Sequence, residues 1–301
     1  MASSKPSFPF PVPAPDPSDE VVREFGPLLR IYKSGRIERP LVAPPVDPGH
    51  DAATGVQSKD VHLGSYSVRL YLPPVAADGA KAKLPVVVYF HGGGFVAESA
   101  ASPSYHLFLN RLAAAVPALV VSVDYRLAPE HPLPRVRRLP RRAQVASSRS
   151  PARRRRRSRA PCSSTPGSGA PRPWARSPRT RRARAMGAGL WFFACPETSG
   201  MDDPRMNPMA PAAPGLHTLA CDRVMVCAAE GDFLRWRGRA YAEAVAAARG
   251  GGGLGDGDAG AGAGVELLET MGEGHVFYLF KPDCDKAKEM LDKMVVFINA
   301  P

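Results

Sequence analysis

Apolar and polar positions follow one another along this chain in an order that predicts a layered α/β fold. The stretch SVRLYLPP at 67–74 alternates apolar and polar residues, as in a half-buried strand, and the β-branched run LPVVVYF at 84–90 predicts a strand buried on both faces. A helix is predicted over 104–115 and a second buried strand over ALVVSVDY at 118–125. Because strand, helix and strand alternate, we expect a mainly parallel sheet flanked by helices.

The same alternation returns in the C-terminal part. VMVCAAEGDF, which reaches Asp232, predicts a strand, 237–247 a helix, and VELLETM a further strand, with a glycine-rich flexible loop at 250–264. GEGHVFYLF, which contains His275, is predicted as a loop, and 284–299 as an amphipathic terminal helix. Asp232 and His275 each follow a predicted strand, at the edge where open α/β sheets place ligands and catalytic groups.

The two ends of this pattern define four segments. Residues 1–18 are proline-rich and predict a flexible arm, and the amphipathic stretch 20–32 predicts a docked helix. Residues 19–134 form the first part of the α/β domain, and 186–301 form the second part. Between them, 135–185 is an arginine-rich segment of different composition.

Composition adds one point to this picture, namely that the positive charge of the chain is concentrated in the segment 135–185. The net charge of +12 includes 18 arginines between residues 135 and 185, a segment without lysine or acid, so the rest of the chain carries −6. The longest apolar run, 112–123, is too short to cross a bilayer, and the N-terminus lacks a secretory core. Five irregularly spaced cysteines suit a reducing compartment. We therefore expect a cytoplasmic protein without membrane contact.

A run of three glycines carries the first chemical signal. Gly92, Gly93 and Gly94 follow a predicted buried strand, and glycines allow backbone N–H groups to turn toward a ligand. An HGGG motif is the known oxyanion-hole element of lipases and esterases. A plain glycine turn is the structural alternative. We expect these glycines to form an oxyanion hole, with Phe95 lining the acyl pocket.

Five motifs together resemble the plant carboxylesterases, which are related to hormone-sensitive lipase and the gibberellin receptors. The motifs are HGGGF, VSVDYRLAPEHPLP, GMDDPRMNPMAP, AAEGDFLRWRGRAY and GEGHVFYLFKP. The resemblance covers roughly 20–135 and 186–301. It implies an α/β-hydrolase fold and a Ser, Asp, His triad in which Asp232 matches the acid and His275 the base.

Elementary chemistry agrees with these two roles. A base must take the serine proton, and a carboxylate fixes the tautomer of the imidazole and stabilises its charged form. The alternative for His275 is a structural role, as a loop histidine whose ring nitrogens only make hydrogen bonds to neighbouring groups. A helix N-cap is the alternative for Asp232, and it is compatible with catalysis.

The nucleophile is missing from the sequence. Family members carry it in a GxSxG elbow, and no GxSxG occurs in this chain. Ser168 lies between two glycines, but Pro166 and Ala170 occupy the flanking positions, and the proline opposes the required buried strand. We therefore assign no nucleophile.

Three hypotheses address the arginine-rich segment: a disordered basic linker, an RNA-binding arm, and out-of-frame translation. Permitted codons for 135–146, translated one nucleotide later, give AYDDSLAALKWL, which resembles the family helix after PEHPLP. A different shift gives family-like text before MGAGLWFFACP. Two faulty junctions in a gene model would also explain the lost elbow, and we favour this hypothesis.

The sequence thus predicts an α/β-hydrolase truncated around its elbow. By resemblance it is a serine-type carboxylic ester hydrolase acting on a small-molecule ester, inactive as written. A non-catalytic small-molecule receptor and nucleic-acid binding through the arginine-rich segment are the alternatives. No metal, no cofactor and no specific nucleic acid are expected, and the oligomeric state is left open.

Overall fold

The computed structural model describes residues 13–74, 84–133, 187–250 and 264–300. Its first element is a small antiparallel sheet of β1 (Val21–Phe25), β2 (Leu29–Tyr32) and β3 (Ile37–Glu38). The helix predicted over 20–32 is therefore wrong. Gly26 lies in the left-handed region at φ 54°, and Pro27 has no N–H to give to a helix, so the chain turns back between β1 and β2.

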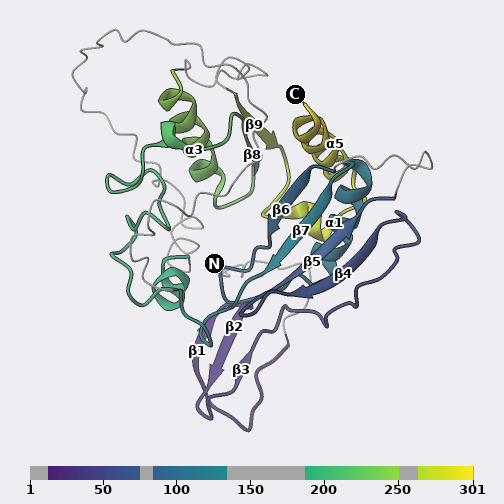
Figure 1. Ribbon diagram of the computed structural model, residues 1–301. Helices are drawn as coiled ribbons and strands as arrows, with labels where there is room; N and C mark the ends of the chain where they lie inside the picture. Colours follow the sequence, from purple (N-terminus) through teal and green to yellow (C-terminus); the bar gives the residue numbers. More distant parts are fainter. Residues whose placement is uncertain (1–12, 75–83, 134–186, 251–263, 301) are drawn as a thin grey trace.

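The main sheet has four strands in the order β4-β5-β7-β6 (Figure 1). They are β4 (Gln57–His62), β5 (Ser67–Leu72), β6 (Val86–Phe90) and β7 (Leu119–Asp124). The β6 and β7 strands are parallel and are joined through α1 (Pro103–Ala115), as the alternation predicts. The sheet is mixed, because β4 and β5 form a hairpin whose inner strand pairs antiparallel with β7.

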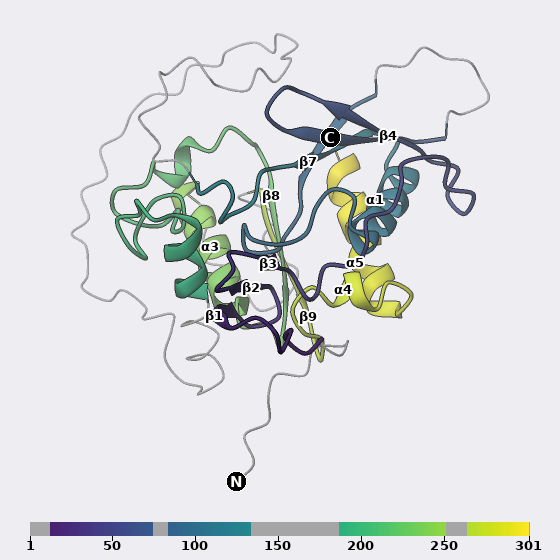
Figure 2. The ribbon, with the colours of Figure 1, turned by 90° about the horizontal axis from the view of Figure 1, so that it is seen from below.

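The C-terminal part repeats the strand, helix, strand unit. Strands β8 (Val224–Ala229) and β9 (Val265–Thr270) are parallel and are connected through α3 (Arg235–Ala248). The chain ends in α4 (Phe277–Phe280) and α5 (Asp285–Asn299), and shorter helical turns occupy 187–194 and Leu216–Thr218. Figure 2 shows α3 on one side of the strands and α1, α4 and α5 on the other.

The principal core lies between the main sheet and helices α1, α4 and α5. Tyr71 and Val120 from the sheet pack with Leu109 and Leu112 of α1, and all four are almost fully buried. Burial of each such side chain stabilises the fold by roughly 1.5–3 kcal/mol. Tyr278, in α4, also packs on this cluster, so the segment that follows His275 is fastened to the main sheet.

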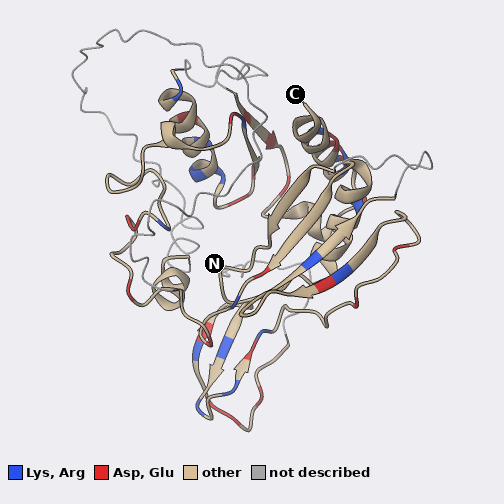
Figure 3. Cartoon of the chain, viewed as in Figure 1, with Lys and Arg blue, Asp and Glu red and all other residues tan. Residues whose placement is uncertain are grey.

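Strand β6 differs from its prediction on one face. Val86, Val88 and Phe90 are 57%, 55% and 65% exposed, so the strand is not buried on both faces as expected. Within the described part of the chain, β6 pairs only with β7, and β8 and β9 form a sheet of their own. The β6 strand contains no charged residue, as its uniform tan colour in Figure 3 shows. The alternating Val87 and Tyr89 face the core, whereas no described residue covers the other face of the strand.

Candidate active site

Asp232 and His275 form a hydrogen-bonded pair. His275 Nδ1 lies 2.9 Å from Asp232 Oδ2, with the acid side chain 14% exposed and the imidazole 45% exposed. In the neutral imidazole, an Nδ1–H that donates to the carboxylate leaves the lone pair on Nε2. A proton acceptor at Nε2 is what a general base requires.

The turn after β8 holds the Asp232 carboxylate in place. Its Oδ1 accepts the backbone N–H of Leu234 at 2.7 Å, while Oδ2 serves His275. Helix α3 begins only at Arg235, whose N–H is donated to the Asp232 carbonyl oxygen. Asp232 therefore organises the approach to the helix with one oxygen and orients the imidazole with the other.

Backbone contacts join the two loops that carry the pair. The Gly231 N–H donates to the Glu273 carbonyl oxygen at 2.8 Å, and a Cβ at Gly231 would lie 3.0 Å from that oxygen. On the other side, Phe233 packs against the His275 ring with centroids 4.9 Å apart. Val276 takes φ 45°, a left-handed conformation that a β-branched residue rarely adopts. Such local strain is typical of functional loops.

The glycines of the HGGGF loop, residues 91–95, have distinct roles. The Gly92 N–H is already donated to Tyr105 Oη at 3.0 Å. The N–H groups of Gly93 and Gly94 have no acceptor among the residues the structure describes. Gly93 has φ 105°, and a Cβ there would lie 2.1 Å from the Ala97 carbonyl oxygen, so only glycine fits. Of the three glycines, Gly92 thus has its N–H engaged, whereas Gly93 and Gly94 have theirs without an acceptor in the described residues.

Tyr125, which directly follows β7, supports this loop. Its hydroxyl donates to the His91 carbonyl oxygen at 2.8 Å and lies 3.1 Å from the Gly92 carbonyl oxygen. The Tyr125 and His91 rings are stacked 4.2 Å apart at 9°. Burial lowers the pKa of His91, whose Nδ1 hydrogen-bonds the Gly92 carbonyl oxygen while its Nε2 has no partner in the described region. His91 is only 4% exposed, so this buried imidazole supports the loop from within.

Phe95 stands at the rim of the loop with φ 66° and 39% of its surface exposed. Its ring contacts Trp191 in the helical turn 187–194, with centroids 6.2 Å apart. The Trp191 indole N–H donates to Thr198 Oγ1, which in turn donates to the buried carboxylate of Asp203. Arg205 pairs with that carboxylate and holds the pKa of Asp203 well below its usual range.

Sequence reasoning overlooked Tyr105, Tyr125 and Trp191. Tyr125 belongs to VSVDYRLAPEHPLP, and its place just after a strand was the available signal. Ser168 and the whole arginine-rich segment lie outside the described residues. Over the described ranges, no group of three or more His, Cys, Asp or Glu side chains is arranged to hold a metal ion, and no helix is long and apolar enough to span a membrane.

The fold is that of an α/β hydrolase. A family model described as alpha/beta hydrolase fold matches residues 87–137, which include the HGGGF loop and Tyr125. A thermostable esterase from Pseudomonas putida superposes with a TM-score of 0.52 at 15% identity, covering 84% of this chain and 86% of that one. An α/β hydrolase from the metagenome of Lake Arreo, Spain, superposes with a TM-score of 0.51 at 21% identity, covering 83% of each chain.

Sequence relatives narrow this class. The "Probable carboxylesterase 2" of Arabidopsis thaliana is 33% identical over 93% of this chain and 97% of its own length. "Tuliposide A-converting enzyme b2, amyloplastic" of Tulipa gesneriana is 37% identical over 93% of this chain and 80% of its own length. The chain belongs to the plant carboxylesterase family of α/β hydrolases. The resemblance drawn from the five motifs is thus confirmed.

Proposed function

We propose that this chain carries the base, the acid and the oxyanion donors of a serine carboxylesterase without its nucleophile. His275 Nε2 is the base, Asp232 fixes its tautomer, and the N–H groups of Gly93 and Gly94 receive the oxyanion of an acyl-serine reaction. The hydrogen bond of 2.9 Å between His275 and Asp232 is the observation that carries this proposal. The substrate class is a small carboxylic ester, in keeping with the family.

Two observations support the absence of the nucleophile. The sequence contains no GxSxG. In addition, β6 ends its sheet with an uncovered apolar face, whereas β8 starts a separate sheet in the described part of the chain. A central strand leading to an elbow would pair with such edges. We attribute its loss to out-of-frame translation of 135–185, and an intact in-frame transcript across this segment would disprove that cause.

A direct experiment tests inactivity. The purified chain is incubated with a short-chain aryl ester and, separately, with a fluorophosphonate probe. We expect only slow hydrolysis, because a base and oxyanion donors without a serine leave weak residual catalysis. Stoichiometric labelling of one serine, together with turnover that the label abolishes, would contradict the proposal.

A non-catalytic small-molecule receptor is the second candidate. The gibberellin receptors share the HGGGF text and the fold, and a receptor has no need of an oriented base. Retention of His275 in contact with Asp232 favours the esterase lineage. Saturable binding of an intact small carboxylic acid, with His275→Ala having no effect, would favour the receptor.

Nucleic-acid binding through the arginine-rich segment is the weaker alternative. That segment has 18 arginines but only Trp174 to stack on bases, so specific single-strand recognition is disfavoured. Non-specific attraction to phosphates would decline steeply with salt. We propose a cytoplasmic location from the cysteine pattern, although several relatives from Tulipa gesneriana are named as amyloplastic or chloroplastic.

A further inference from the structure

The imidazole of His275 offers a chemistry that its role as a base does not use. Its Nδ1 lies 2.9 Å from the Asp232 carboxylate, and in the described part of the chain its Nε2 makes no hydrogen bond. Because 45% of the side chain is exposed, a small molecule can reach the ring from solvent. Histidine is among the side chains that can attack a substrate and form a covalent intermediate. His275 is therefore a candidate nucleophile as well as a base.

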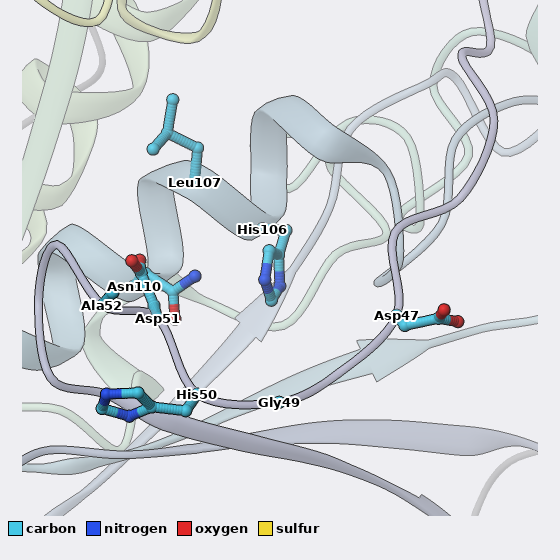
Figure 4. A pocket seen from close by; sticks show the side chains of 8 residues that line it. All are labelled: Asp47, Gly49, His50, Asp51, Ala52, His106, Leu107 and Asn110. Atoms are coloured by element: carbon cyan, nitrogen blue, oxygen red, sulfur yellow. The ribbon is translucent and has the colours of Figure 1, made fainter.

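Two other imidazoles, His50 and His106, line a hollow beside α1 (Figure 4) and show the contrast. His50 Nδ1 accepts from the Gln57 amide nitrogen at 2.9 Å. His106 Nδ1 accepts from the Arg69 guanidinium at 3.4 Å. In each neutral ring the proton is therefore on Nε2 and the lone pair faces the protein. Among the histidines that the structure describes, only His275 contacts a carboxylate and keeps the Nε2 lone pair free.

Asp232 favours attack by this nitrogen in two ways. Because an ionised carboxylate can only accept, its bond to Nδ1 of the neutral imidazole leaves the lone pair on Nε2. Attack on an acyl carbon then places a positive charge on the ring, and the carboxylate stabilises that charge as it stabilises an imidazolium. The Asp232 side chain is only 14% exposed, so water screens this attraction in part and does not abolish it.

Charged side chains beside this pair have partners of their own. Glu273 lies 3.2 Å from Lys281 Nζ, and Arg235 pairs with Glu269 at 3.0 Å. Glu230 accepts a backbone N–H of the loop after β9 at 2.9 Å. These charges are therefore compensated away from the imidazole, which contacts a single carboxylate in the described ranges.

The leaving group decides which ester can react in this way. An alkoxide is a far stronger base than an imidazole, so the intermediate formed from an alkyl ester expels the imidazole and returns to the start. A nitrophenolate is a much weaker base than an alkoxide, so it leaves instead. The ring of such an ester also has a surface to pack on, because Phe233 lies beside His275 with the ring centroids 4.9 Å apart.

We propose that His275 Nε2 attacks small activated aryl esters directly and carries their acyl group transiently. This activity rests on the proposed function in one respect, since it requires that no serine takes the acyl group first. The Nε2–acyl bond forms as the phenolate leaves with the electron pair of the C–O bond, which gives an acylimidazolium opposite the Asp232 carboxylate. Water then adds to the acyl carbon, the C–N bond breaks, and its electron pair returns to Nε2. The products are a carboxylic acid, a proton and the neutral imidazole.

Rapid mixing of the full chain with para-nitrophenyl acetate, followed by native mass spectrometry at neutral pH, tests this proposal. We expect an acetyl adduct that forms as nitrophenolate is released and decays as acetate appears. His275→Ala should lower the yield of this transient adduct by at least about tenfold, because the nucleophile is lost. His50→Ala is the matched control and should leave the yield unchanged, since it removes an exposed imidazole that has no carboxylate partner in the described ranges.

Asp232→Asn tests the contribution of the carboxylate. The neutral amide does not offset the charge of the acylated ring and does not fix its tautomer, so acylation should slow by at least about tenfold. The melting temperature of each variant, measured by circular dichroism, identifies any loss of the fold. Ethyl acetate should not be consumed by the unsubstituted chain, because ethoxide does not leave in preference to imidazole.

The outcomes separate this inference from the proposed function. Hydrolysis that depends on His275 without an acetyl adduct would mean that the imidazole activates water, which overturns the covalent step and leaves the proposed function intact. An acetyl group on a serine, with turnover that a fluorophosphonate abolishes, would overturn both. An equal yield of transient adduct in His275→Ala, or unchanged acylation in a folded Asp232→Asn variant, would overturn the inference alone.

Discussion

Asp232 and His275 are 43 residues apart in the chain, and their side chains meet at 2.9 Å because β8 and β9 are adjacent and parallel. Parallel strands end at the same edge of a sheet, so the loops that follow Ala229 and Thr270 lie next to each other. The Gly231–Glu273 hydrogen bond then fixes their separation. The pair is thus a product of topology and does not depend on the arginine-rich segment.

Repair of the chain should convert this pair into a working base. With the family-like frame and a GxSxG elbow restored, His275→Ala should nearly abolish ester turnover, because no other described base is paired with a carboxylate at this sheet edge. Steady-state hydrolysis of an aryl ester measures this. A repaired enzyme that is active and indifferent to His275→Ala would show that the base is assigned wrongly.

Asp232→Asn should act differently in the same repaired enzyme. The amide oxygen or nitrogen still fits the site, but the imidazole loses its tautomeric preference, with a rate loss on the order of 10⁴ by analogy with serine proteases. Asp232 Oδ1 also accepts the Leu234 N–H, so the melting temperature should be compared with that of wild type. A rate loss that follows only the fraction of unfolded protein would indicate a structural role.

Gly93→Ala should damage the oxyanion loop. The added Cβ would meet the Ala97 carbonyl oxygen at 2.1 Å, and φ 105° is strained for alanine. In the repaired enzyme we expect kcat to fall more than KM rises, because the displaced N–H groups act mainly in the transition state. Gly187→Ala is the matched control, since its Cβ would meet nothing within 4 Å.

Tyr125→Phe should loosen the same loop without removing its glycines. The variant keeps the ring that stacks on His91 but loses the hydrogen bonds of 2.8 and 3.1 Å to the loop carbonyls. We expect a loss of about 1 kcal/mol in the free energy of unfolding. Chemical denaturation measures it, and an unchanged midpoint and slope would show that water replaces the hydroxyl.

Acid should weaken the support beneath Phe95. The pKa of Asp203 is lowered in the folded state, chiefly by Arg205, so its contribution to stability is present above the unfolded pKa of about 3.9 and is lost as the pH falls below it. Asp203→Asn should remove this component at neutral pH. The melting temperature, measured by thermal unfolding between pH 7 and pH 3, should therefore fall less steeply with decreasing pH for the variant than for wild type.

The sequence predicted best those elements that have strong periodicity. The helix expected over 104–115 and the strands expected over 118–125 and 265–271 appear within about one residue of these limits, whereas the strand expected to close on Asp232 already ends at Ala229. The amphipathic segment 20–32 forms two strands instead of a helix, because the chain turns back at Gly26 and Pro27. The exposure of β6 could not be inferred from its residues, because burial depends on neighbouring strands and not on β-branched composition.

The candidate site was predicted in part. Asp232 and His275 were found through motif context, and their contact followed from the strand order. The sequence could not predict which of the three glycine N–H groups is already hydrogen-bonded. That depends on Tyr105 in α1, whose hydroxyl accepts the Gly92 N–H. Such a contact between distant segments leaves no periodic pattern in the text of a single sequence.

The geometry at Gly93 also limits which substitutions this position can accept during evolution. Every nucleotide change that replaces a glycine codon with that of another amino acid adds a Cβ, and here that atom would collide with the Ala97 backbone. Selection for folding alone would therefore keep this glycine, whether or not an ester is hydrolysed. In a related sequence, a conserved HGGGF motif would therefore indicate the fold alone. A conserved Asp–His pair in contact would be the better indicator of catalysis.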